Sequence, residues 1–276
     1  MRVPGQPMTS IATWNVNSIK ARLPNVLAWL KAAQPDVALL QELKCIDDNF
    51  PRLEIEELGY NVAVHGQKSY NGVAILSKAP LEDVLCGLPG NDGDDHARYV
   101  EATLGGSGGR GLRVASIYLP NGNPIGTEKF SYKLAWMDRL LGHARGLLAS
   151  EQPVVLGGDF NVIPQDEDVY DPRAFATDAL AQPESRSRFR ALLNLGYTDA
   201  LRALHRAPHL YTFWDYQAGG WQHDHGLRID HFLLSPQAAD LLESCDIDRA
   251  PRGEPKASDH TPVVCRLRDT AQRAAA

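Results

Sequence analysis

Hydrophobic and polar positions along the chain follow two different periods, which indicates that strands and helices are mixed. Short apolar runs typical of strands occupy residues 11–15, 37–41, 61–65, 73–77, 99–104, 114–118, 154–156, 229–234 and 262–267. Apolar side chains spaced by three and four predict helices at residues 23–33, 50–58, 129–148, 188–195 and 236–243. Both kinds of element therefore occur throughout the chain.

The order of these elements favours one fold class. Strands and helices do not alternate regularly, and hairpin-like pairs of strands occur, one of them around the glycine-rich residues 105–111. This order predicts an α/β fold, a four-layered sandwich in which two mixed β-sheets pack face to face with helices outside. The polar ends of the strands would then meet at one edge of the sandwich.

Length and composition fit one domain. The chain has 276 residues, of which 43% are hydrophobic, and this is enough for a large core. No linker rich in Pro, Gly or Ser and no block of charge divides the sequence. We expect a disordered N-terminus at residues 1–8, a single domain at residues 9–267 and a frayed tail at residues 268–276.

The strand ends carry the candidate chemistry. The segment Val155–Asn161 reads as a hydrophobic strand that runs into two glycines and delivers Asp159 and Asn161 to one side of an extended backbone. Other strand ends offer matching polar groups, namely Asn15, Asn17, Glu42, Asp230, Asp259 and His260. Buried acids need a partner or a cation, so these groups predict one shared polar site suited to phosphate chemistry.

Net charge and cysteine content limit the binding partners and the cellular compartment that we expect. The formal net charge of −6 argues against a general nucleic-acid binder, although a binding face is local and an acidic metal site itself lowers the net charge. The four cysteines are scattered and form no Cys-x-x-Cys pair, which predicts free, mostly buried thiols in a reducing compartment. No apolar run suits a signal peptide or a membrane span, so we expect a soluble cytoplasmic monomer.

Eight short motifs resemble one known family. In chain order they are Trp14–Asn17, Leu40–Lys44, Tyr70–Ala74, Tyr118–Gly122, Gly157–Asn161, Tyr211–Trp214, Gly226–Asp230 and Ser258–His260. Each motif alone is a weak signal, but their order and intervals together are specific. From about Thr9 to Leu267 the sequence resembles the exonuclease III family of DNA-repair nucleases, which includes the major apurinic/apyrimidinic endonucleases.

The resemblance implies a fold and an activity. The family fold is a four-layered sandwich of the deoxyribonuclease I type. Its members are phosphodiesterases that use Mg²⁺ or Mn²⁺ and act on double-stranded DNA. They incise 5′ to abasic sites, and many also remove nucleotides or blocking groups from 3′ ends. We expect the same cofactor and the same DNA partners for this chain.

The resemblance also implies metal-binding residues. Glu42 and Asp259 would place the metal through their carboxylates. Asn15 would hold a metal-bound water or orient Glu42, and Asp159, Asn161 and His260 would stand near enough to contact the ion as well. Asn17 would support Asn15 or cap the following helix, and the sequence leaves both roles open.

Catalytic roles follow from the same motifs. Asp230 and His260 match the family's Asp–His pair, in which the carboxylate fixes the imidazole tautomer. Asp159 would take the proton of the attacking water or protonate the leaving oxygen, but His260 is an alternative acceptor of that proton. Asn161, Tyr118 and Asn121 would contact the phosphate as its charge builds up.

An apolar group of residues is expected to form a substrate pocket. Phe213, Trp214, Leu227 and Ile229 stand where the family lines a pocket for an extruded abasic sugar, and ordinary core packing is the alternative. Leu227 takes a place that is sometimes Trp, which implies a roomier pocket. Arg228, with Lys44, Lys68 and Arg98, is a candidate for phosphate contacts or for steadying the acidic cluster.

Two other functions remain to be compared with this one. The wider superfamily includes phosphatases of lipids and inositol phosphates, but the aromatic residues near Phe213 and the run from Gly226 to Asp230 favour DNA. A non-catalytic DNA-binding scaffold is the second alternative. Such a protein has no need of Glu42, Asp159 and His260 together, which argues against it.

Overall fold

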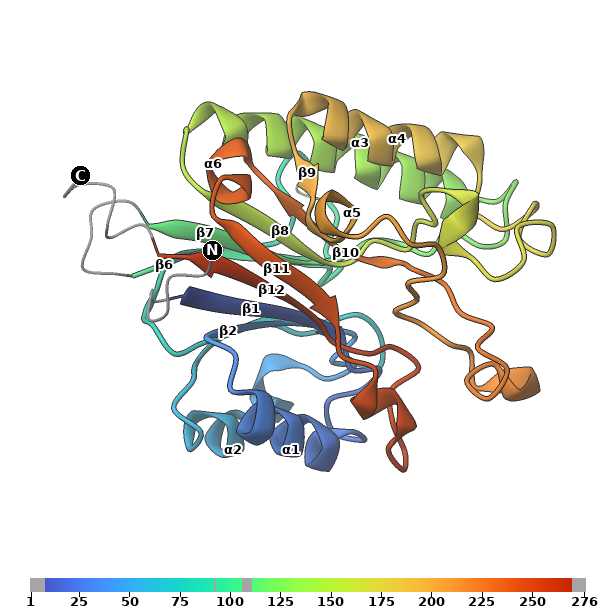
Figure 1. Cartoon of the computed structure of the whole chain (residues 1–276). Helices are drawn as coiled ribbons and strands as arrows, with labels where there is room; N and C mark the ends of the chain where they lie inside the picture. Colours follow the sequence, from blue (N-terminus) through green and yellow to red (C-terminus); the bar gives the residue numbers. More distant parts are fainter. Residues whose placement is uncertain (1–7, 92, 106–110, 270–276) are drawn as a thin grey trace.

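Two six-stranded β-sheets lie face to face in the computed structural model of the chain (Figure 1). Helices α1 (Leu23–Ala33) and α2 (Arg52–Glu56) cover one outer face, and α3 (Glu128–Ala149) and α4 (Pro183–Leu195) cover the other. The predicted four-layered α/β sandwich of the deoxyribonuclease I type is therefore confirmed.

Each sheet mixes parallel and antiparallel strands. The first sheet has the spatial order β11 (Leu242–Ile247), β12 (Val263–Arg268), β1 (Met8–Asn15), β2 (Val37–Gln41), β4 (Val73–Ser77) and β3 (Asn61–His65). The second has the order β5 (Leu81–Cys86), β6 (Tyr99–Leu104), β7 (Leu112–Tyr118), β8 (Val154–Asp159), β10 (Asp230–Leu234) and β9 (Thr198–Asp199). Only β1 with β2 and β7 with β8 run parallel among these pairs.

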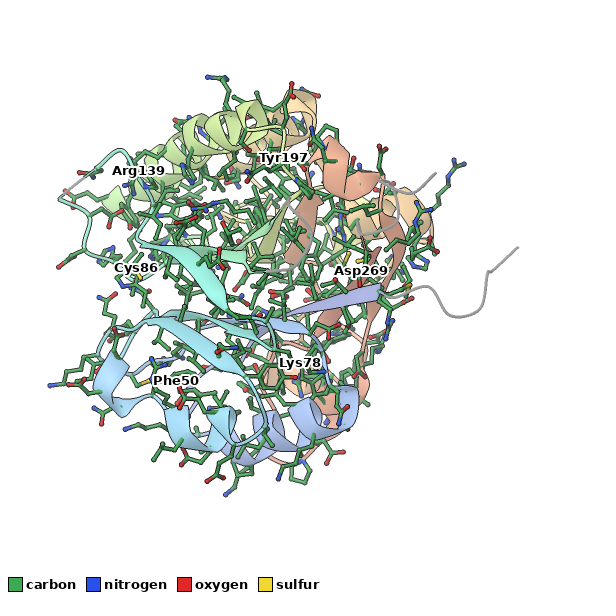
Figure 2. The ribbon with its side chains drawn as sticks, turned by 90° about the vertical axis from the view of Figure 1, so that its left-hand side faces the viewer. Phe50, Lys78, Cys86, Arg139, Tyr197 and Asp269 are labelled. Carbon is green, nitrogen blue, oxygen red and sulfur yellow. The ribbon has the colours of Figure 1, made fainter. Side chains whose placement is uncertain are left out.

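Alternation along the strands divides the core into layers. In β1, Ile11 packs between the sheets, while Trp14 belongs to the cluster beneath α1 and meets the ring of Trp29 edge-on at 5.5 Å. Figure 2 shows side chains filling the layers on both sides of the sheets, with Phe50 in the lower helical layer and Tyr197 in the upper one. The short helices α5 (Ala200–Leu204) and α6 (Pro236–Ala239) add residues to the core between the sheets.

The two glycines of β8 are part of the strand and not of a turn. Gly157 pairs with Phe232 of β10, and Gly158 pairs with Ile117 of β7. A Cβ atom on Gly158 would lie 2.0 Å from the carbonyl oxygen of Ile117, so no larger residue fits there. Because both glycines remain in the strand, β8 extends to Asp159 and delivers its carboxylate at the end of the sheet.

Several elements differ from the sequence-based predictions. Helix α4 begins at Pro183 and not at residue 188, and α5 and β9 were not predicted. The expected helix at 236–243 ends at Ala239, and the chain continues as the edge strand β11, which pairs with β12. That pairing satisfies the outer backbone groups of β12, a long-range gain that helical periodicity does not report. The strand β5 was also missed, because its side chains are largely exposed and show little apolar pattern.

The structure describes residues 8–91, 93–105 and 111–269. Within these ranges the paired strands reach Met8 and Arg268, one residue beyond each expected domain limit, and the expectations for the outermost ends lie outside the described residues. The four cysteines are free, and only Cys86 is exposed. Over the same ranges, no helix combines the length and the apolar character needed to cross a membrane.

Gly157 is required by the close approach of the two sheets. A Cβ atom at this position would lie 2.6 Å from Phe232 and 2.7 Å from Leu39 of the opposite sheet. We expect Gly157→Ala to lower the free energy of unfolding by about 1–3 kcal/mol in urea titrations. Gly142→Ala is the control, since nothing lies within 4 Å of its Cβ position in α3. That change should stabilise by about 0.5–1 kcal/mol, and equal effects of the two changes would contradict the argument.

Candidate active site

Topology brings the polar strand ends to one place. The parallel pairs β1–β2 and β7–β8 end on the same side, with Asn15, Tyr118 and Asp159 as their last residues. β10 runs antiparallel to β8, so its first residue, Asp230, lies directly opposite Asp159. His260 precedes the antiparallel strand β12 and arrives at the same edge. The predicted meeting of strand ends is therefore what the structure contains.

An amide joins the two central carboxylates. The Asn15 side-chain nitrogen donates to Glu42 Oε1 at 2.9 Å and to Asp159 Oδ2 at 3.0 Å. Lys44 lies on the far side, with its Nζ 2.9 Å from Glu42 Oε2. Asn17 does not cap a helix, because α1 begins only at Leu23; its amide donates to Asp259 Oδ1 at 3.0 Å.

His260 is held in one orientation by a buried carboxylate. Its Nδ1 lies 2.8 Å from Asp230 Oδ2, which also accepts a 2.6 Å hydrogen bond from the Thr212 hydroxyl. Because a carboxylate only accepts, Nδ1 carries the hydrogen. The other ring nitrogen, Nε2, lies 3.7 Å from Asp159 Oδ2. The imidazole therefore faces the acidic cluster with its second nitrogen.

Burial and neighbouring charges shift the pKa values of these groups. Burial, reinforced by the charges of Asp230 and Glu42, raises the pKa of Asp159 to about 7 against the opposing effect of His260. Burial alone would lower the pKa of His260, but the carboxylates of Asp230 and Asp159 outweigh it and raise that pKa. Near neutral pH the Asp159–His260 pair therefore retains at least one proton.

The donor set fits a divalent metal ion. Among the described residues, Glu42, Asp159 and His260 each offer one ligand atom, and these atoms lie within 4.8 Å of one another. Carboxylate oxygens are the ligands that hard divalent cations prefer, and a cation would relieve the repulsion between the two acids. Asp259 lines the same cavity but does not belong to this tight group.

Two asparagines form a second, uncharged part of the site. Asn161 Nδ2 donates to the carbonyl of Leu119 at 2.9 Å, and Asn121 Nδ2 donates to Asn161 Oδ1 at 3.2 Å. Behind them the buried Lys133 donates to the carbonyls of both residues, at 3.0 Å for Asn121 and 2.5 Å for Asn161. Burial lowers the pKa of Lys133 to about 7. This lysine was missed in the sequence, although a lone charge on the apolar face of a helix could have indicated it.

The acidic cluster forms part of the wall of a cavity. The cavity has a volume of about 470 Å³, and the apolar side chains of Phe213, Leu227 and Ile229 line it together with polar residues such as Asp159 and His260. Trp214 does not reach this cavity, because its side chain is 0% exposed and its indole nitrogen donates to Asp224 Oδ1 at 2.9 Å. The expectation that Trp214 lines the pocket is corrected accordingly.

Arg228 also turns away from the cavity. Its side chain is 1% exposed, and its guanidinium lies 2.6 Å from Asp168 Oδ1 and 2.9 Å from Asp199 Oδ2. Residues along an extended segment alternate between two sides, so Leu227 and Ile229 face the cavity while Arg228 faces the interior. Its expected contact with substrate is replaced by a structural role. Arg98, by contrast, stacks over the ring of Tyr118 at 4.9 Å.

Loops complete the cavity with residues that the motifs did not contain. They are Tyr170, Phe175, Asp178, Leu180, Asp215, Gln217, Ala218, Gly220 and His225. The segments that carry them have no regular helical or strand period, so no pattern in the sequence pointed to these side chains.

Comparison with known proteins agrees with this geometry. Residues 12–260 match the sequence profile of the Endonuclease/Exonuclease/phosphatase family. The chain is 32% identical to exodeoxyribonuclease III of Haemophilus influenzae over 259 residues. This alignment covers 91% of this chain and 97% of that protein. The chain belongs to the exonuclease III family. The predicted family and the predicted enzyme class, a hydrolase of the nuclease type, are confirmed.

Solved structures of exonuclease III relatives share the fold closely. The 3′ phosphatase NExo from Neisseria, bound to a product DNA hairpin, is 38% identical and has a TM-score of 0.89, with 94% of this chain and 99% of that chain covered. An AP endonuclease from Archaeoglobus fulgidus is 36% identical and has a TM-score of 0.87, with the same two shares covered.

The buried ion pairs of Arg228 provide a stability test. Arg228→Met would leave Asp199 and part of Asp168 without their partner, so we expect the free energy of unfolding to fall by about 3 kcal/mol or more. Arg188→Met is the matched control, because Arg188 pairs with Asp138 at the surface, where less than about 1 kcal/mol is at stake. Urea unfolding measures both changes. If Arg228→Met has normal stability but binds DNA more weakly and with a changed salt dependence, Arg228 contacts a DNA phosphate after all.

Asp159 links the stability of the cation-free protein to pH. Its pKa is raised from 3.8 to about 7 by folding, so its contribution is fully present below about pH 4 and is lost as the pH rises through 7. The neutral variant Asp159→Asn should therefore be more stable than the wild type near pH 8 in a chelator. The difference should shrink towards pH 4 when urea unfolding is repeated there. A difference that grows on acidification would contradict the direction of the shift.

Proposed function

We propose that one domain, residues 9–267, is a Mg²⁺-dependent DNA-repair phosphodiesterase, for which Mn²⁺ can substitute. It acts on double-stranded DNA as a cytoplasmic monomer, incises 5′ to abasic sites and removes nucleotides or blocking groups from 3′ ends. The observation that carries the proposal is the convergence of Glu42, Asp159 and His260 in the wall of a cavity that Phe213, Leu227 and Ile229 also line. A phosphate at this point would lie between a cation site and a sugar-sized apolar wall.

The acidic cluster would hold the cation. Glu42 and Asp159 supply its first oxygens, Asn15 keeps the two carboxylates in register, and Asp259 lies near enough in the cavity wall to contribute through water. When bound, the cation neutralises phosphate charge that these acids would otherwise repel.

Protein side chains would manage the protons and the phosphate charge. The oxygen of a water molecule attacks phosphorus, and the bond from phosphorus to the 3′-oxygen breaks. The 3′-oxygen leaves with the bonding electron pair and takes up a proton from solvent. Asp159 takes the water's proton, while Asp230 keeps His260 oriented and charged beside the phosphate. If His260 takes the proton instead, the same geometry applies with the roles exchanged. Asn161, Asn121 and Tyr118 stabilise the charge on the phosphate oxygens.

The relatives support both halves of the proposal. They include a 3′ phosphatase bound to product DNA and an AP endonuclease, and both are more than 35% identical to this chain. Two different reactions thus occur among proteins of similar sequence and fold. Both reactions hydrolyse a phosphate ester at a 3′-oxygen, so one site can serve them.

The role of Asp159 gives a direct test of the activity. Asp159→Asn should remain folded and lose turnover by roughly 10³-fold or more, because it can neither accept a proton nor bind the cation as a charge. The substrate is an end-labelled duplex with one abasic analogue, incubated with Mg²⁺, with Mn²⁺ or with chelator, and product lengths distinguish incision from trimming. Asp138→Asn at the surface is the control and should retain normal activity. Near-normal cleavage by Asp159→Asn, or cleavage of phospholipid but not of DNA, would refute the proposal.

A further inference from the structure

Two aromatic rings stack in the wall of the cavity. The rings of Tyr170 and His225 are 4.4 Å apart and nearly parallel, at 10°. Both line the cavity, yet both are exposed, Tyr170 by 37%. A ring pair that served only to pack two loops together would be buried. This pair instead presents aromatic surface to the solvent-filled cavity.

The stack is held in place from both loops. The Tyr170 amide donates to the carbonyl of Gly226 at 3.1 Å, next to the isolated bridge between Val169 and Leu227. The ring of Phe175 meets Tyr170 edge-on at 5.9 Å. The Tyr170 ring is therefore positioned before any ligand arrives, which lowers the entropic cost of stacking on it.

The stack and the reacting groups share one wall of the cavity. Phe213 meets the ring of His260 edge-on at 4.9 Å, and Leu227 bridges to Phe213 on one side and to Val169 on the other. Tyr170 follows directly in the chain. This succession leads from the imidazole at the reacting centre to the stacked rings. The cavity of about 470 Å³ falls in the range that holds drug-sized ligands, so it has room beyond a single sugar ring.

The two proposed reactions place different groups in this space. In incision, the sugar on the 3′ side of the broken bond carries no base. In 3′ trimming, the nucleotide released from that same side carries one. A base attached to a sugar against Phe213 and Leu227 extends away from the phosphate, and the Tyr170–His225 stack offers it an aromatic surface in the same cavity.

We propose that Tyr170 and His225 form a stacking platform for the nucleobase of a 3′-terminal nucleotide and thereby favour 3′ trimming over abasic incision. The inference rests on the proposed function and deepens it, since it assigns the balance between the two reactions to named residues. Stacking tolerates every base, because each has a π face. The platform therefore selects for the presence of a base and not for its identity.

Variants of the stack separate its effect on the two substrates. One duplex carries a normal recessed 3′ end, the other an internal abasic analogue, and both are followed under single-turnover conditions with Mg²⁺. Tyr170→Ala and His225→Ala should each lower release of the terminal nucleotide by roughly tenfold, the scale of one lost base stack. Abasic incision should stay within roughly twofold of the wild type, because its sugar does not reach the rings.

Tyr170→Phe is the matched control, since it keeps the ring and removes only the hydroxyl. It should trim 3′ ends at the wild-type rate. A terminal 2-aminopurine gives a readout without catalysis: its fluorescence should be quenched on binding to the wild type in chelator and recover in Tyr170→Ala. An equal loss on both duplexes, or no loss on either, would overturn the inference while leaving the proposed function intact. A wild-type protein that cleaves neither duplex would overturn both.

Discussion

The structure of the site depends on one electrostatic constraint, the burial of several carboxylates within a few ångströms of one another. Asp159 is buried between Glu42 and Asp230, where solvent cannot screen their mutual repulsion. Hydrogen bonds and an ion pair from the neighbouring groups offset this repulsion. The Asn15 amide donates to two of the acids, Thr212 and His260 both bond Oδ2 of Asp230, and Lys44 pairs with Glu42. The charge that remains favours the arrival of a cation and then of a phosphate.

Much of this arrangement is accessible from sequence because strand ends have a fixed geometry. Parallel strands end on one side of a sheet, and an antiparallel partner begins there, so polar residues after or before apolar runs must converge. Asn15, Glu42, Asp159, Asp230 and His260 were predicted on that basis and lie together. Their chemical roles remain proposals, since proximity alone does not say which group moves a proton.

The predicted and observed positions of side chains differ where residues adjacent in sequence face different parts of the structure. Trp214 and Arg228 each stand beside a cavity residue, and a motif read as a unit assigned them to the same surface. Strand-like alternation sends them to the opposite side, Trp214 towards Asp224 and Arg228 towards Asp168. Tyr170, His225 and Lys133 illustrate the other limit. Loop paths and a buried charge on a helix depend on contacts between distant segments, which periodicity cannot report.

The pairing of β1 with β12 has a consequence for folding during synthesis. The Ser258 hydroxyl donates to the carbonyl of Asn15, and the Trp14 indole donates to the carbonyl of His260, so the two ends of the sequence close the site together. A nascent chain that lacks β12 holds its acidic residues but has no closed first sheet to hold His260 beside them. The site is therefore complete only once synthesis has passed β12.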